Sequence, residues 1–295
     1  MSIKIVQASL LVALSGILYG FLGVLGTHIL QESISIPAML FWRFFIAGCA
    51  MLVFVIFKNS QKKISFSVDK MTLFYMFLLG AFGYATSSAL YFAASRYTGT
   101  GLAMVIFFSY PIIVALFSIV FHRKGMTKGT LLTLFLICLG LFLMKQSPDN
   151  AFSMLGIFFA VASAICYAIY VFGSKHLSAL HLDANVLTTF VCFGCAFILL
   201  LYTLFTHTFA VPHTLHNWIY LITFGVVVTA LPIQLMLQGL KVISSMRASI
   251  ISVLEPLVTV FLGILILHEN ISHMQLLGAL IILASALFVQ FQKEL

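Results

Sequence analysis

Ten long apolar runs, separated by short segments that carry polar, glycine or proline residues, occupy almost the whole chain. A helix needs about 20 mostly apolar residues to cross the hydrocarbon core of a bilayer. The pattern therefore predicts an all-α integral membrane protein that forms a single membrane domain over 1–295, with ten transmembrane helices. These are expected near 6–29, 36–57, 71–94, 98–121, 127–145, 153–174, 184–206, 218–240, 244–267 and 272–291.

The composition agrees with a surface that faces lipid. Charged residues make up 7% of the chain and the mean hydropathy is +1.17, whereas a soluble protein carries about 25% charged residues. The net charge of +8 lies in short loops rather than in one patch, which argues against a nucleic-acid partner. The first run continues to about Ile29 and exceeds the apolar core of a signal peptide, so we expect a first span there.

The basic residues predict the orientation. Lys and Arg concentrate in the cytoplasmic loops of inner-membrane proteins. With both termini cytoplasmic, only Arg96 and Lys145 fall clearly on the outer side. The residues then assigned to the cytoplasm are Lys4, Lys58, Lys62, Lys63, Lys70, Arg123, Lys124, Lys128, Lys175, Lys241 and Lys293.

The chain is internally duplicated, with repeat one at 6–145 and repeat two at 153–291. A shift of 145 residues aligns Gly80 with Gly225, Arg96 with Lys241 and Pro111 with Pro256, and a shift of 148 aligns Ser15 with Ser163, Tyr19 with Tyr167 and His28 with His176. Each repeat holds five spans, so the two halves must enter the membrane from opposite sides. Two inverted five-helix repeats are a recurring plan of secondary transporters.

Several local motifs resemble those of the drug/metabolite transporter superfamily, and within it the EamA type. They are Trp42-Arg43-Phe44, Tyr91-Phe92-Ala93-Ala94-Ser95-Arg96-Tyr97-Thr98, Tyr110-Pro111, Leu254-Glu255-Pro256-Leu257 and His268-Glu269. The resemblance implies an inner-membrane transporter of small polar metabolites (amino acids, nucleotide-like molecules, vitamins or drugs) that works by alternating access. It implies no cofactor and a monomer or homodimer. The first half departs from the pattern at His122-Arg123-Lys124-Gly125, where an acidic residue like Glu269 is expected, so no symmetric carboxylate pair is predicted there.

Glu255 is the first candidate for a substrate or proton site. It lies about midway along the ninth run, where an ionised carboxylate is unfavourable and usually faces a cavity or a partner. Pro256 can break the helix at this point. A proton is the candidate coupling ion. In the alternative, Glu255 is structural, and Ser252 and Thr259, one turn away on either side, supply its hydrogen bonds.

Arg43 is the second candidate, about one third into the second run from the outer side. Its guanidinium is suited to an anionic group such as a carboxylate. Its place near the interface favours a structural role instead, in which the side chain extends to the outer headgroups or binds another helix. Arg247, at the inner start of the ninth run, is expected to meet lipid phosphate or a loop.

Polar and aromatic residues in other runs complete the predicted site. Tyr19 and Tyr167 occupy matching positions, and Tyr19 lies beside a stripe of small residues, Gly16, Gly20, Gly23 and Gly26, where another helix can approach closely. A polar face inside a span is expected to look inward or to hydrogen-bond another helix. The predicted substrate-binding residues are Tyr19, Arg43, Tyr84, Ser88, Tyr91, Tyr110, Tyr167, Gln234, Gln238, Ser252 and Glu255.

Other motifs are weak. Cys192 and Cys195 match a redox pair in spacing but are expected to pack as small apolar residues, and His207, His213 and His216 are expected to be loop residues rather than metal ligands. No phosphate-binding loop, nucleophile elbow or HExxH helix occurs, so no enzymatic activity is predicted. The remaining alternatives are a membrane enzyme acting on a lipid-linked substrate and a receptor or assembly protein without transport.

Overall fold

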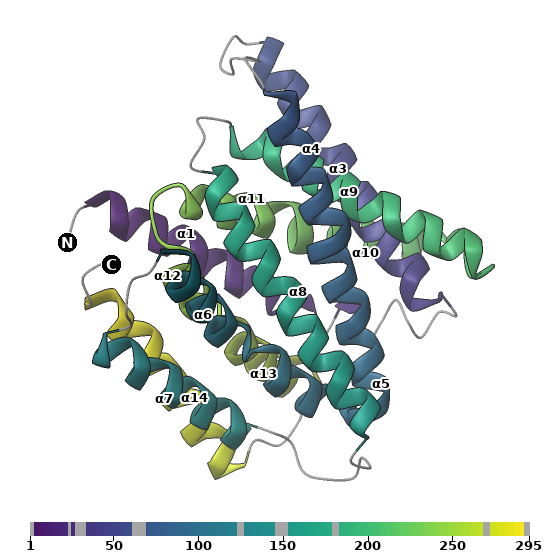
Figure 1. The fold of residues 1–295 in the computed structure, drawn as a ribbon. Coiled ribbons are helices and arrows are strands. Elements are labelled where there is room, and N and C mark those ends of the chain that lie inside the picture. Colours follow the sequence, from purple (N-terminus) through teal and green to yellow (C-terminus); the bar gives the residue numbers. More distant parts are fainter. Residues whose placement is uncertain are drawn as a thin grey trace.

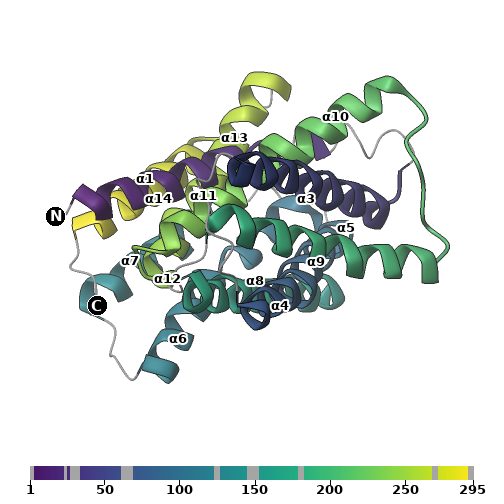
Figure 2. The ribbon, with the colours of Figure 1, turned by 90° about the horizontal axis from the view of Figure 1, so that it is seen from above.

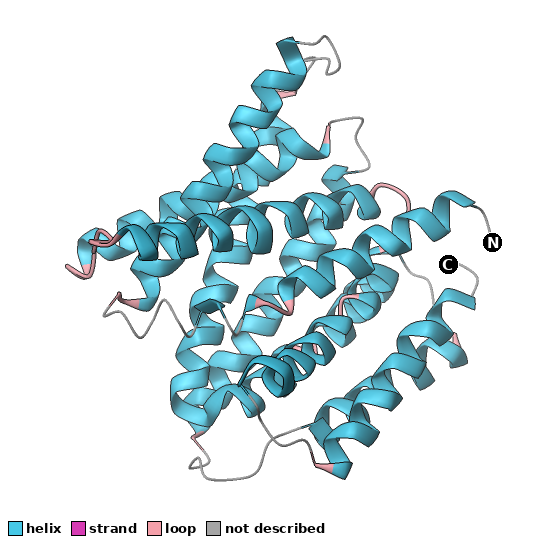
Figure 3. Cartoon of the chain, turned by 180° about the vertical axis from the view of Figure 1, so that it is seen from behind, coloured by secondary structure: helices cyan, strands magenta, loops and turns pink. Residues whose placement is uncertain are grey.

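The structure is a computed structural model that describes residues 3–22, 25–26, 34–60, 69–122, 127–144, 153–178, 183–267 and 272–291. Every regular element in these ranges is a helix, as Figure 3 shows. The predicted sites at His28, Lys62, Lys63, Arg123, Lys124, Lys145, His268, Glu269 and Lys293 lie outside the described residues.

The helices follow the predicted runs closely. In order they are α1 (Ile3–Tyr19), α3 (Ile36–Ser60), α4 (Lys70–Leu78), η1 (Leu79–Ala85), α5 (Thr86–Phe107), α6 (Tyr110–His122), α7 (Lys128–Met144), α8 (Met154–Ser178), α9 (Ala184–Phe205), α10 (Leu215–Gly225), η2 (Val226–Ala230), α11 (Leu231–Leu240), α12 (Ser245–Ile251), α13 (Leu254–Leu267) and α14 (His273–Phe291). The starts of the second-half runs are reproduced to within three residues.

Five of the described helical segments are long and apolar enough to cross a membrane: Ile36–Ser60, Lys70–Thr98, Met154–Leu177, Ala184–Phe205 and Leu215–Leu240. Four shorter apolar helices accompany them: Ile3–Tyr19, Tyr110–Phe121, Lys128–Leu143 and Leu276–Ser285. Large apolar side chains remain exposed along these helices, among them Phe82, Phe135 and Phe158. Such a surface is unfavourable in water and suits a lipid environment.

The helices pack in pairs around a central group (Figures 1 and 2). α8 lies along α5, α9 lies along α3, and α11 lies along α1. α7 and α14 form a separate pair at one side of the molecule. The start of α1 and the end of α14 lie on the same side of the molecule in Figure 1.

The chain reverses direction within α5, although its backbone is helical throughout. The rings of Tyr91 and Phe107 are 5.3 Å apart between centroids, whereas 16 residues of straight helix would separate them by about 24 Å. Ala94 and Ala103 likewise belong to one buried cluster. The boundary predicted between the third and fourth runs, at 94–98, therefore lies in the part of the chain that turns.

Two π-helices interrupt the third and eighth runs. η1 lies between α4, which packs on α9, and α5, which packs on α8. η2 lies between α10, which packs on α3, and α11, which packs on α1. A π-turn adds a residue to the helical turn and changes the face that follows. Each π-helix thus stands where a long helix changes its packing partner.

Two helices break at related positions. The first break separates α5 from α6 at residues 108–109, and the second separates α12 from α13 at residues 252–253. Pro111 is the second residue of α6, and Pro256 is the third residue of α13. Proline is tolerated in the first helical turn, where its missing N–H is not needed, and it prevents the preceding helix from continuing.

Glycines allow the closest helix crossings. A Cβ atom at Gly80 in η1 would fall on the backbone carbonyl of Val191 in α9, and one at Gly194 in α9 would fall on the carbonyl of Phe77. Neither carbonyl can move without shifting its helix. By contrast, a Cβ at Gly16 would lie 3.5 Å from the carbonyl oxygen of Ser252, which is an ordinary contact.

The first prediction follows from these contacts. Gly80→Ala should lower the free energy of unfolding by roughly 1–3 kcal/mol, because the added methyl group forces η1 away from α9. Gly16→Ala should leave stability nearly unchanged. Thermal unfolding of the detergent-purified proteins measures both effects, and equal melting temperatures for the two variants would contradict the packing described.

Candidate functional site

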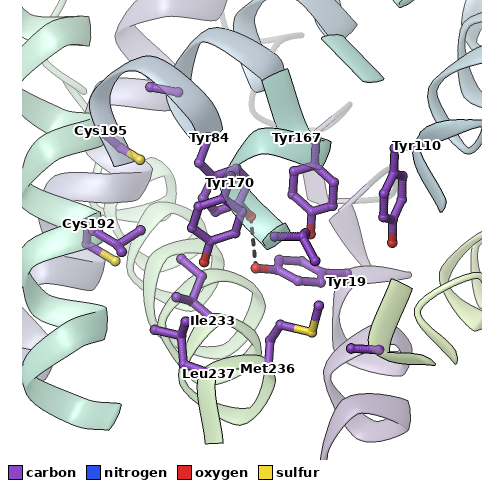
Figure 4. Packing of buried hydrophobic residues seen from close by; sticks show 14 of the residues in the cluster. Tyr19, Tyr84, Tyr110, Tyr167, Tyr170, Cys192, Cys195, Ile233, Met236 and Leu237 are labelled. Carbon is purple, nitrogen blue, oxygen red and sulfur yellow. Dashed lines mark hydrogen bonds between the residues drawn. The ribbon is translucent and has the colours of Figure 1, made fainter. Parts of the chain in front are cut away.

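Tyrosine side chains from four helices meet in the centre of the molecule (Figure 4). Tyr84 stacks on Tyr170 at 4.9 Å and contacts Tyr167 at 5.6 Å between ring centroids. Tyr110 meets Tyr167 edge to face at 4.7 Å. The hydroxyl of Tyr84 donates to that of Tyr19 at 2.8 Å, the dashed line in Figure 4. We call these five residues the tyrosine cluster.

The tyrosine cluster joins both halves of the chain. Tyr19 comes from the end of α1, Tyr84 from η1, Tyr110 from the start of α6, and Tyr167 and Tyr170 from α8. All five side chains are buried, with Tyr170 and Tyr110 at 1% exposure. Edge-to-face and stacked arrangements of this kind are favourable for aromatic rings.

Arg43 lies against the tyrosine cluster and is almost completely buried, at 2% exposure. Its Nε donates to Thr229 Oγ1 at 2.7 Å, and its Nη2 donates to the Tyr84 hydroxyl at 3.4 Å. The guanidinium carbon lies 4.9 Å from the ring centre of Phe44 and 5.0 Å from that of Phe224. Of the two structural roles expected for Arg43, extension to the outer headgroups and binding of another helix, the structure shows the second, because its side chain turns inward between π-helices η1 and η2.

Glu255 lies at the second helix break, in the first turn of α13. Its side chain is half-buried. A Cβ atom at Gly16 would lie 3.6 Å from the backbone nitrogen of Glu255, so the start of α13 lies beside α1, one turn before Tyr19. The first turn of a helix carries a partial positive charge that stabilises a carboxylate. The structure thus places the start of α13 beside the helix that carries Tyr19.

The hydroxyl groups expected to donate hydrogen bonds to the Glu255 carboxylate have other partners. Ser252 Oγ donates to the carbonyl of Ala248 at 3.0 Å. Thr259 Oγ1 lies 3.1 Å from the backbone carbonyl of Glu255 and 3.2 Å from that of Gly20. Both threonine contacts are to backbone oxygens, so neither residue donates to the carboxylate. This removes the structural alternative that rested on Ser252 and Thr259.

Other predicted residues line the same region. Tyr91 is half-buried beside Phe107. Ser88 is buried at 9% exposure on the same helix. Its neighbour Ser87 exchanges hydrogen bonds with Ser163 of α8, so the polar face of the third run is used in part for helix contacts.

The predicted pair Gln234 and Gln238 lies apart from the tyrosine contacts described. Gln234 Nε2 donates to Asn185 Oδ1 at 3.0 Å, near the start of α9. Gln238 is half-buried further along α11. Lys175 Nζ donates to the carbonyl of Leu240 at 2.7 Å. These contacts join the ends of α8, α9 and α11, which the basic residues assign to the cytoplasmic side.

Lys241 stands at the same end, beyond the last turn of α11. Burial lowers its pKa, and the nearby carboxylate of Asp183 opposes this shift. Arg247 is buried at 4% exposure in α12, which packs against α1, α6, α8, α11 and α14.

The cysteines and histidines of the weaker motifs make packing and hydrogen-bond contacts of the usual kind. Cys195 donates to the carbonyl of Gly80 at 3.1 Å and packs in the core with Cys192, and all five cysteines are free. His216 contacts the ring of Tyr220. Within the described residues no three His, Cys, Asp or Glu side chains gather in a way that would hold a metal ion.

Some members of the site were missed by the sequence analysis. Tyr170 lies one helical turn after Tyr167, so its spacing could have placed it on the same face. Thr229 gave no signal, because it reaches Arg43 only through the π-turn of η2. Phe44 and Phe224 were indistinguishable from the many phenylalanines that face lipid.

Apolar helices of spanning length around a buried group of tyrosines and one arginine define a multi-pass membrane protein. The chain belongs to the EamA-like transporter family, whose model matches it twice, at residues 6–145 and 154–291. The resemblance predicted from the motifs is thereby confirmed.

Proteins similar to this chain are also described as transporters. An uncharacterized inner membrane transporter of Salmonella typhimurium, YicL, is 27% identical over 288 residues, 96% of this chain and 95% of the relative. An uncharacterized transporter of Archaeoglobus fulgidus is 30% identical over 209 residues, 71% of this chain and 73% of the relative. A solved crystal structure shares the fold with a TM-score of 0.81 at 14% identity, covering 96% of this chain and 98% of that one. The family and these names point to transport rather than catalysis.

The second prediction concerns Arg43. Arg43→Lys should destabilise the protein by roughly 1–3 kcal/mol, because lysine lacks the Nε donor and the planar group that fits between Phe44 and Phe224. Arg96→Lys is the matched control, since Arg96 is exposed.

Thermal unfolding in detergent tests this prediction. A lower melting temperature for Arg43→Lys and an unchanged one for Arg96→Lys are expected. An Arg43→Lys protein as stable as the parent, yet unable to transport, would contradict a structural role and assign Arg43 to substrate binding.

Proposed function

We propose that this protein is a secondary transporter or facilitator that moves small polar metabolites across the inner membrane by alternating access. Its two five-helix halves, 6–145 and 153–291, are inverted relative to each other and rock around a midplane site. The observation that carries the proposal is the group of buried polar side chains at two helix breaks in a chain whose family consists of transporters. Broken helices near the midplane are typical of transporter binding sites.

Matching contacts in the two halves support the inverted arrangement. Ser15 donates to the carbonyl of Pro232 at 2.8 Å, and Ser163 donates to the carbonyl of Ser87 at 2.8 Å. The serines are 148 residues apart and their acceptors 145 residues apart, the two shifts of the sequence repeat. The first helix of each half therefore packs against the third helix of the other half.

Glycine contacts repeat in the same way. Gly80 approaches the carbonyl of Val191, and Gly225 approaches the carbonyl of Arg43. These positions again differ by 145 and 148 residues. Such an exchange between halves is expected of two half-folds related by an axis in the membrane plane. With the excess of basic residues in alternate loops, it supports ten spans with both termini in the cytoplasm.

The substrate site we propose lies at the tyrosine cluster, with Glu255 and Arg43 beside it. Tyr19, Tyr84, Tyr91, Tyr110, Tyr167, Ser88 and Ser252 are its other predicted members. Gln234 and Gln238, which lie on α11, belong to the cytoplasmic end of the path.

Glu255 is the residue we propose for proton coupling. It is the acidic residue at the tyrosine cluster, and a carboxylate inside a membrane protein commonly exchanges protons along a transport path. Both proton and substrate then act at the junction of the two halves, where rocking changes their access.

The third prediction tests transport and coupling together. In proteoliposomes we expect counterflow of at least one compound in a metabolite panel, and uptake that responds to an imposed pH gradient. Glu255→Gln should retain counterflow but lose the response to the gradient, because a neutral amide cannot exchange a proton.

Glu255→Asp is the matched variant that keeps the carboxylate and should keep a gradient response. A Glu255→Gln protein whose uptake responds to the gradient as the parent does would refute the proton role alone. Absence of counterflow for every compound, with folded protein in the vesicles, would refute transport itself.

A further inference from the structure

The end of α11 is fastened to two neighbouring helices by polar side chains. Lys175 Nζ of α8 donates to the carbonyl of Leu240, the last residue of α11, at 2.7 Å. Gln234 Nε2 of α11 donates to Asn185 Oδ1 of α9 at 3.0 Å. The last four carbonyls of an α-helix have no donor within the helix, and this end carries partial negative charge, so an ammonium group is a favourable partner. We call the hydrogen bond from Lys175 to Leu240 the cytoplasmic tie.

The cytoplasmic tie joins two helix pairs that both contribute to the tyrosine cluster. α8 lies along α5 and carries Lys175 together with two members of the cluster. α11 lies along α1, which ends at Tyr19, and Ser15 of α1 donates to the carbonyl of Pro232 in α11 at 2.8 Å. The sequence repeat relates the two pairs, because α8 corresponds to α1 and α11 corresponds to α5. A contact between α8 and α11 therefore holds equivalent pairs together at one end.

The repeat places different residues at the corresponding positions near the outer side. The counterparts of Lys175, Leu240, Asn185 and Gln234 under the two shifts are Thr27, Ser95, Pro37 and Ala89. A threonine carries no cation, and the side chains of proline and alanine have no hydrogen-bonding group. The same side-chain contacts cannot form there. The duplicated scaffold is thus fastened in this way on the side that the basic residues assign to the cytoplasm, and not on the other.

Resting on the proposed alternating access, we propose that Lys175 is a gate residue: the cytoplasmic tie holds this structure closed to the cytoplasm and breaks when the protein opens inward. Lys175 is half-buried, so water can replace the carbonyl oxygen as its partner when the helices part. Because α11 is bonded to α1, separation of α11 from α8 also moves Tyr19 relative to the tyrosines of α8. Opening of the gate and rearrangement of the tyrosine cluster are then one movement.

Two matched positions report access from each side of the membrane. Gln238 is half-buried one turn after Gln234, on the face of α11 that meets α9. Ala93, its counterpart 145 residues earlier, is half-buried in α5, three residues before Arg96.

The membrane-impermeant thiol reagent MTSET measures this access without any substrate. Gln238→Cys is labelled in inverted vesicles, and Ala93→Cys is labelled in right-side-out vesicles. The same proteins without the introduced cysteine give the reaction of the five native cysteines, which is subtracted.

The variants at Lys175 separate its charge from its bulk. Lys175→Met keeps the length of the side chain and removes the ammonium group. It should raise the labelling rate of Gln238→Cys roughly 5-fold and lower that of Ala93→Cys to about half, because a two-state equilibrium that is mostly closed to the cytoplasm becomes balanced. Lys175→Arg retains a cationic donor and should label as the parent does. Lys128→Met is the control for loss of a lysine: Lys128 is exposed at the start of α7, so neither rate should change.

The outcomes are distinct. Unchanged labelling of both probes in Lys175→Met would overturn the gate, and so would a Lys175→Arg protein that labels like Lys175→Met. Faster labelling of Gln238→Cys with unchanged labelling of Ala93→Cys would show that the end of α11 is only loosened, and would also overturn it. Opposite changes at the two probes, in a protein that shows no counterflow of any compound, would leave the two-state gate standing and refute transport.

Discussion

The rest of the structure depends on the burial of one guanidinium. Arg43 leaves α3 and reaches both π-helices, donating to Thr229 in η2 and to Tyr84 in η1. Tyr84 in turn donates to Tyr19. A single charged side chain thereby connects segments from both halves of the chain through hydrogen bonds that lie inside the protein, away from lipid. In a membrane interior, where apolar association between helices is weak, such polar contacts fix which helices lie together.

The hydrogen bonds of Arg43 also decide which charged groups at the centre of the molecule remain available to a ligand. The scaffold is repeated, but its charges are not: Arg43 corresponds to Val191 in the other half, and Glu255 corresponds to Tyr110. The positive member of the two is bound by protein, and the negative member lies in the first turn of α13, at the second helix break. The two halves thus place equivalent backbone segments at the centre of the molecule, whereas the charged side chains on those segments differ between the halves.

Most of the helix positions could be predicted from the sequence, because long apolar runs and prolines are local signals. Pro111 and Pro256 follow the two helix breaks, and Glu255 was identified from its depth in a span alone. Depth does not report direction, so the sequence left open whether Arg43 extends to the headgroups or binds another helix, and the structure shows the second. The π-helices have no residue signature, so the contact of Thr229 with Arg43 could not be predicted. The partner of Gln234, Asn185, lies on another helix and also gave no local signal. Tyr170 needed only the spacing from Tyr167.

The π-helices limit where the chain can gain or lose residues. One residue of helix turns the chain by about 100°. Deleting a residue within η1 would return it to ordinary α-helix and rotate all of α5 relative to α4, so that Ser87 would no longer face Ser163. A deletion in η2 would do the same to α11 and Ser15. We therefore expect gain or loss of a single residue to be tolerated in the connections between spans and not in η1 or η2.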